Sequence, residues 1–236
     1  MRFVIVICSF GLAAASFDYT GRPTLEDVKN FYDSGEPIYI LKRSFELLHE
    51  KYNVICIYNE KQELQNTKLT IKEAYALGTS IYYYMVTINL TPGKGMDDAP
   101  VMEATPGRYK WRDSSTKWFW DGGRYEQGRN TRKYRFQYYD KSQHCAVLTF
   151  DDGIKRCELH FWAREEIFVA APKHIRGQPP PSPSGFENCE REYKNLCPDA
   201  KSYDVYSSQC KNWFLPKLRD ISWQPVLIAE KSASTL

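Results

Sequence analysis

The side chains best suited to chemistry lie in one short stretch, CAVLTFDDGIKRCELHFW, which runs from Cys145 to Trp162. Its Asp-Asp-Gly sequence stands between two runs of strand-forming residues, which predicts a β-hairpin with a tight turn. Because successive residues of a strand point to opposite faces, Glu158, His160 and Trp162 share one face and Cys157 lies on the other. A carboxylate and an imidazole placed in this way can bind a polar ligand or form a structural pair.

The sequence gives little support to catalytic or metal chemistry. None of the four histidines has HExxH spacing, and there is no Gly-x-Ser-x-Gly elbow or phosphate-binding glycine loop. Asp151-Asp152-Gly153 lacks the further ligands of an EF-hand and fits a hairpin turn better. A zinc site is disfavoured because no close Cys-x-x-Cys pair exists. We therefore expect no enzyme activity, no metal and no cofactor.

The first sixteen residues, MRFVIVICSFGLAAAS, have the layout of a secretory signal peptide, with a basic residue, an apolar run and small residues at the end. The run is too short to span a bilayer, and no later stretch is long and apolar enough. We expect residues 1–16 to be removed and residues 17–236 to form a single soluble, secreted domain. Asn89, in Asn-Leu-Thr, is the one candidate glycosylation site.

Cysteine usage agrees with export. One of the seven cysteines lies in the leader, and those that remain are Cys56, Cys145, Cys157, Cys189, Cys197 and Cys210. An even number in an oxidising compartment predicts three disulfides, although the sequence alone leaves about 15 pairings open.

The elements that must position these residues can be read along the chain. Thr24 followed by LEDVKNFY predicts an N-capped helix with Asp27 as the capping-box acid. Strand-like runs follow at residues 37–45, 52–58, 67–75, 80–90, 108–120, 132–139, 145–150 and 155–162. Residues 177–185 are rich in proline and predict an extended linker. Residues 186–197 have helical spacing that places two cysteines on one face of a second helix.

Two helices around about eight antiparallel strands predict a closed up-and-down β-barrel, because closure removes exposed sheet edges. An open β-sandwich with a similar number of strands is the alternative. Eight strands leave an interior that side chains can fill or that can hold one small ligand.

Several motifs together resemble a known family. They are Glu36–Leu41 with Arg43-Ser44, Cys56 in the second strand, Tyr139-Asp140 before Cys145, Cys157-Glu158-Leu159, and the closing pattern of Cys189, Tyr193, Cys197 and Cys210. This set is similar to the tick salivary lipocalins, which include the histamine-binding proteins, over nearly the whole mature chain. The resemblance implies a secreted eight-stranded barrel from saliva that captures host mediators such as histamine, serotonin, leukotrienes, fatty acids or other lipids. It also implies Cys56–Cys210 and Cys145–Cys189 disulfides, which leaves Cys157 with Cys197.

Strand faces and the resemblance together define a candidate ligand site. If the cysteines face the second helix, Glu158 and His160 line the barrel interior. Arg135 corresponds approximately to a ligand-contacting arginine of the lipid-binding members, so we predict that it forms a polar pole with these two residues. Further predicted ligand contacts are Tyr32, Tyr39, Gln137, Tyr139, Leu148 and Trp162. The alternative is a structural Arg135–Glu158 pair beside a His160 that is simply part of the wall.

Two ligand classes stay open. An amine requires interior carboxylates and aromatic faces. The family's amine pattern resembles Cys157-Glu158-Leu159 followed by Glu166-Ile167, with Glu in place of Asp and a slightly short gap. A lipid mediator requires an apolar tunnel that ends in a cation or in hydrogen-bond donors, which Arg135 and His160 provide.

A different class of function rests on residues 108–139, where basic residues alternate with aromatics. Such a surface can bind a sulfated glycan or a host protein such as a complement component. The same alternation is also expected of barrel walls. The net charge of the whole chain is only +3, so no polyanionic partner is required. We expect a monomer that binds a small molecule, with neither nucleic acid nor membrane as partner.

Overall fold

The computed structural model describes residues 22–49, 52–77, 80–95, 98–112, 118–120, 131–163, 184–207 and 210. The predicted signal peptide, Glu166-Ile167 and most of the Pro-rich segment lie outside these ranges. Within them, no helix is long and apolar enough to cross a membrane.

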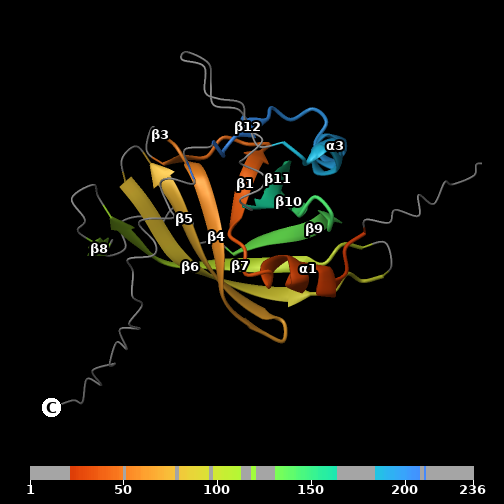
Figure 1. Cartoon of the computed structure of the whole chain (residues 1–236), viewed down its shortest axis with the longest axis horizontal. Coiled ribbons are helices and arrows are strands. Elements are labelled where there is room, and N and C mark those ends of the chain that lie inside the picture. Colours follow the sequence, from red (N-terminus) through yellow and green to blue (C-terminus); the bar gives the residue numbers. More distant parts are fainter. Residues whose placement is uncertain are drawn as a thin grey trace, which may run out of the picture.

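Eight strands form a closed antiparallel barrel (Figure 1). They are β1 (Ile38–Arg43), β4 (Ile55–Gln65), β5 (Lys68–Leu77), β6 (Ser80–Thr91), β7 (Val101–Arg112), β9 (Arg132–Asp140), β10 (Cys145–Asp151) and β11 (Lys155–Trp162). Each pairs with the next along the chain, and β11 pairs with β1 to close the ring. The short strands β2 (Leu48–His49) and β3 (Tyr52–Asn53) form a hairpin, while β8 (Trp118–Trp120) and β12 (Tyr203–Asp204) pair with β7 and β1. The barrel prediction is therefore confirmed.

Helix α1 (Leu25–Tyr32) closes one end of the barrel (Figure 1). It begins with the predicted capping box, in which the Asp27 amide donates to Thr24 Oγ1 and the Thr24 amide donates to Asp27 Oδ2. Phe31 is fully buried and stacks on Trp162, whose indole N–H donates to the Phe31 carbonyl at 3.0 Å. Burial of Phe31 and Tyr32 against the strands makes α1 the floor of the barrel.

Helix α3 (Glu187–Leu196) packs on the outer face of the barrel, against β9, β10 and β11 (Figure 1). The three disulfides are Cys56–Cys210, Cys145–Cys189 and Cys157–Cys197, the pairing that the resemblance implies. Two of them attach α3 and its C-terminal end to the β10–β11 hairpin.

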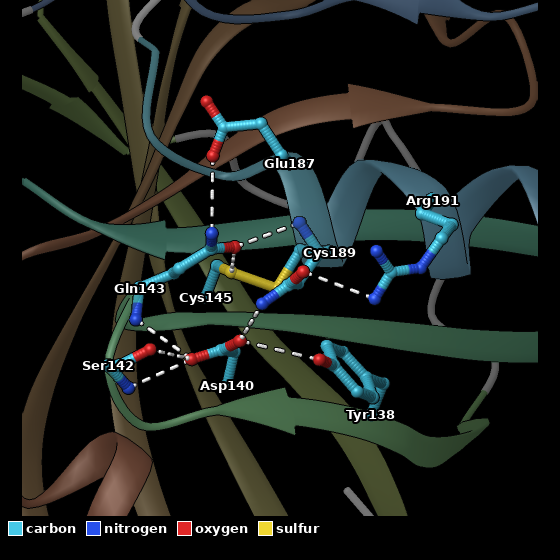
Figure 2. The surroundings of a disulfide bond; sticks show 9 residues. Tyr138, Asp140, Ser142, Gln143, Cys145, Glu187, Cys189 and Arg191 are labelled. Atoms are coloured by element: carbon cyan, nitrogen blue, oxygen red, sulfur yellow. Dashed lines mark hydrogen bonds between the residues drawn. A yellow bond between two sulfur atoms is a disulfide. The ribbon is translucent and has the colours of Figure 1, made fainter.

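Polar contacts reinforce this attachment (Figure 2). One oxygen of Asp140 accepts from the amides of Ser142 and Gln143, each at 2.9 Å, and the other accepts from the Asn188 side chain at 2.7 Å. Gln143 in turn accepts from the Asn188 amide, and it donates to Glu187. The turn between β9 and β10 is thereby fixed to the first turn of α3, beside the Cys145–Cys189 bond.

The strand predictions differ most at two places. The run predicted at 52–58 is the short β3 followed by β4, which extends to Gln65, and β7 begins at Val101 instead of residue 108. Pro106 and Gly107 obscure this strand in the sequence because both residues usually interrupt strands. The register shifts opposite them, between Tyr84 and Val86, and a Cβ on Gly107 would lie only 3.0 Å from the Met85 carbonyl oxygen. The glycine thus permits a close backbone approach within the barrel wall.

Candidate ligand-binding site

The barrel encloses a cavity of about 240 Å³. Its apolar wall is mostly aliphatic and includes Ile40, Val54, Ile57, Ile71, Val86, Ile88, Met102, Ala104 and Leu148. Its polar and aromatic lining includes Tyr32, Arg43, Asn59, Glu73, Tyr75, Tyr84, Arg132, Tyr134, Glu158 and His160. An engineered apolar cavity of about 150 Å³ holds benzene, so this volume suits a molecule with one aromatic ring and short substituents.

The Glu158–His160 pair stands inside this cavity as the strand alternation predicts. His160 Nε2 lies 3.0 Å from Glu158 Oε2, and both residues are 4 % exposed. Burial alone raises the pKa of Glu158, but the hydrogen bond and charge of His160, together with Arg132 and Arg43, lower it below its usual range. Glu158 is therefore an ionised, buried carboxylate. The other imidazole nitrogen, His160 Nδ1, is buried and has no hydrogen-bond partner among the described residues.

Arg43 enters the cavity because β1 contains a bulge. Ile38 and Ile40 pair with Trp162 and His160, but the register then shifts, so that Arg43 pairs with Glu158. One extra residue reverses the face of every residue after it. Arg43 consequently points inward and is 3 % exposed, next to the buried carboxylate.

Glu73 supplies a second interior carboxylate, from β5. It accepts a hydrogen bond from the Tyr84 hydroxyl on β6. Burial raises the pKa of Glu73, an effect that the Tyr84 hydrogen bond reduces and the nearby charge of Glu158 reinforces. On the neighbouring strand β4, Asn59 pairs with Glu73, and its side-chain oxygen is buried without a hydrogen-bond partner among the described residues. This wall of the cavity is thus rich in hydrogen-bond acceptors.

Arg132 is the cation that β9 brings to the cavity. Its guanidinium lies 4.3 Å from the centre of the Phe150 ring, and Nη1 donates to the Tyr134 hydroxyl at 3.0 Å. Burial raises the pKa of Tyr134, so this phenol stays neutral and keeps its proton. Arg132 is itself exposed, which places it where the cavity meets solvent.

The prediction that Arg135 belongs to the polar pole is wrong. Its guanidinium forms an ion pair with Asp98, and half of its side chain is exposed. The cause is a bulge in β9, where Tyr138 pairs with Val147 and Phe136 with Leu148, so that Gln137 is the extra residue. Strict alternation from Tyr139 would have turned Arg135 inward.

The remaining predicted contacts divide between three places. Tyr32 and Leu148 line the cavity. Tyr139 and Trp162 face the same interior but pack into the floor with α1 rather than onto the open space. Tyr39 is buried on the outer face, where its ring contacts the aromatic rings of Tyr58, Phe161 and Tyr206. Gln137 also lies on the outer face and donates to Thr149 at 3.1 Å.

Sequence reasoning missed Arg43, Asn59, Glu73, Tyr84 and Arg132 as cavity residues. A signal for Glu73 was present, because Ile71, Glu73 and Tyr75 alternate on one face of a strand opposite Tyr84 and Val86. Arg43 had no such signal, since only the bulge turns it inward.

The lining offers charged groups and hydrogen-bond donors and acceptors to a ligand. Among the described residues no group of three or more His, Cys, Asp or Glu could hold a metal ion. The Asp151–Gly153 segment is a hairpin turn, with Gly153 at a φ of 97° and its amide donating to Asp151.

Larger hollows of about 480 and 640 Å³ lie outside the barrel between β9 and α3, where charged side chains such as Arg22 and Arg191 line them.

Comparison with known proteins finds similarity among solved structures but not among family models or curated sequences. No protein-family model and no curated protein matches the chain. Among solved structures, the chain is similar to Japanin from Rhipicephalus appendiculatus, which was determined bound to cholesterol. The two are 13 % identical with a TM-score of 0.44, over 73 % of this chain and 93 % of Japanin. Such a distant likeness carries nothing about the ligand of this chain.

The class of protein follows from the barrel itself. Eight antiparallel strands in up-and-down order, a helix across one end, a helix on the outer face and an interior cavity define a lipocalin-type fold. The three disulfides have the pairing that the sequence resemblance to the tick salivary lipocalins implies.

Proposed function

We propose that this chain is a secreted protein that sequesters one small host mediator inside its barrel, by binding and not by turnover. The observation that carries this proposal is the buried, hydrogen-bonded Glu158–His160 pair, which lies in a cavity with aliphatic, aromatic and polar lining residues. Cavities with apolar walls and a few fixed polar groups are typical of ligand-binding sites. Three disulfides support an extracellular location.

The geometry favours a small aromatic amine as the ligand. Glu73 and Glu158 both face the cavity, and the tyrosines Tyr32, Tyr75, Tyr84 and Tyr134 provide ring faces and hydroxyls around them. Carboxylates combined with aromatic rings stabilise a buried ammonium group. The volume of about 240 Å³ suits one ring with an aminoalkyl chain better than a long acyl chain.

A short amphipathic lipid is the second candidate, and the aliphatic lining of the cavity favours it. Side chains such as Ile57, Ile71 and Ile88 would surround an alkyl chain, as apolar walls do in lipid carriers. Its polar end would then lie beside Arg132 or His160. The polyanion alternative concerns the surface of residues 108–139, and the side chains of residues 108–130 lie outside the described part of the chain.

Isothermal titration of the full secreted chain tests the proposal. The probes are phenethylamine, its uncharged counterpart 2-phenylethanol, and decanoate. We expect one molecule of phenethylamine per chain and roughly tenfold weaker binding of 2-phenylethanol, because a charge-assisted hydrogen bond is lost. Binding of decanoate alone would favour the lipid. Saturable binding of none of the three would overturn the proposal.

A further inference from the structure

The guanidinium of Arg43 is only partly satisfied by the protein. Its Nη2 atom donates to the backbone carbonyls of Val54 at 2.8 Å and Leu47 at 3.4 Å. These two bonds fix the guanidinium against the β2–β3 hairpin. The Nε and Nη1 atoms are buried and have no hydrogen-bond partner in the described part of the chain. Since a guanidinium carries five N–H groups, three donors are left on these two nitrogens.

Such an arrangement is costly unless something accepts these hydrogen bonds. A buried donor without an acceptor loses its hydration and gains nothing in return, and the loss is greater for a charged group. Glu158, the interior carboxylate on the paired strand, bonds to His160 through Oε2 and accepts no hydrogen bond from the Nε or Nη1 atom of Arg43. Phe45 covers another side of Arg43, with its ring centre 5.5 Å from the guanidinium carbon. Arg43 lines the cavity, so a ligand bound there can supply an acceptor.

Arg43 also stands apart from the acceptor-rich wall. Glu73 of β5 lies opposite Asn59 of β4, and Asn59 lies opposite Ile38 at the start of β1. Arg43 lies five residues beyond Ile38 on β1. The cavity therefore presents acceptors on β4 and β5 and unused donors on β1. A ligand that satisfies both must carry a donor at one end and an acceptor at the other.

We propose that Arg43 is a ligand-binding residue that receives an acceptor oxygen, a carboxylate or carbonyl, at the end of the ligand remote from its amine. The natural ligand is then a small amphoteric aromatic molecule and not a simple amine. This inference rests on the proposed function, because it requires that the cavity binds a small molecule.

The test compares two ligands with the same body. Phenethylamine carries only the amine, and 4-(2-aminoethyl)benzoate adds a carboxylate at the far end of the ring. We expect the benzoate to bind the full secreted chain at least about tenfold more tightly, because it meets otherwise unpartnered charged donors. Arg43→Gln removes this preference and Arg43→Lys reduces it. Arg135→Gln, an arginine change on the outer face, leaves the preference unchanged.

A measurement on the unaltered protein covers the case in which the Arg43 variants fail to fold. In ¹⁵N-labelled protein, the Arg43 Nε–H resonance moves downfield and exchanges more slowly when the benzoate binds, but not when phenethylamine binds. If the two ligands bind with equal affinity, or if the Arg43 Nε–H resonance is unchanged when the benzoate binds, Arg43 has only a structural role. Failure of both ligands to bind would instead overturn the proposed function.

Discussion

His160 and Glu158 form a hydrogen-bonded pair at 3.0 Å in the middle of the barrel, two residues apart on the same face of β11. Arg43 lies opposite Glu158 on the paired strand β1, and its charge together with that of Arg132 helps to keep Glu158 ionised. Opposite charges thus meet in a low-dielectric interior, where the loss of one leaves the others uncompensated.

Glu158→Gln should therefore destabilise the fold strongly. The change preserves shape but leaves the guanidinium of Arg43 buried without its ionised neighbour, and breaking a buried pair costs about 3 to 5 kcal/mol. Urea denaturation measures the free energy of unfolding. Asp98→Asn is the matched control, because it breaks the exposed pair with Arg135, and exposed ion pairs contribute little to stability. Equal losses in the free energy of unfolding would mean that the interior pair contributes no more to stability than the exposed pair.

Asp140 should make stability depend on pH in the acid range. Burial raises its pKa, but hydrogen bonds from Ser142, Asn188 and Gln143 outweigh this and bring the pKa from 3.8 to about 2. Because the folded pKa is below the unfolded one, the stabilisation is complete above about pH 4 and is lost as the pH falls towards about 2. Asp140→Asn should reduce the dependence of the free energy of unfolding on pH across this window. Urea denaturation at each pH measures this dependence. An unchanged slope would assign the acid sensitivity to other carboxylates.

Binding of an amine should be linked to the protonation of Glu73. Burial raises the pKa of Glu73 in the free protein, and a bound ammonium favours the carboxylate, so binding releases a proton. Affinity for phenethylamine should rise as the pH increases through the pKa of Glu73 and then level off. Titration calorimetry in two buffers of different ionisation enthalpy measures the proton release. Glu73→Gln should abolish it, and an undiminished release in that variant would place the proton elsewhere.

Removal of the Cys145–Cys189 bond should loosen α3. The double variant Cys145→Ala/Cys189→Ala should lose about 2 to 5 kcal/mol of stability, as is usual for a native disulfide. Hydrogen exchange should accelerate first in Glu187–Leu196, because only the hydrogen bonds with Asp140 and Gln143 then hold the start of the helix. Protection of α3 equal to that of the unaltered protein would show that packing, not the disulfide, fixes the helix.

Features with a regular period were predictable from the sequence. The alternation in β11 placed Glu158 and His160 inside and Cys157 outside, and the capping box located α1. These predictions succeed because a strand has a period of two and a capped helix has a defined start. The disulfide pairing came from the family resemblance, since the sequence alone left all pairings open.

The errors at the site have one physical origin. The bulges in β1 and β9 each insert one residue, which turned Arg43 inward and Arg135 outward against the alternation. Bulges leave no periodic signal in a single sequence, because either face of such a strand contains both apolar and basic residues. The arginine predicted for the polar pole was thus the wrong one, although the pole exists.

The measurement that tests the central claim most directly fills the cavity and follows ligand binding. Ala104 lines the cavity, while its neighbour Thr105 is exposed on the other face of β7. Ala104→Phe should abolish binding of phenethylamine in titration calorimetry while the protein stays folded, and Thr105→Phe should leave one binding site of unchanged affinity. Unchanged binding by a folded Ala104→Phe variant would contradict the claim that the barrel interior holds the ligand.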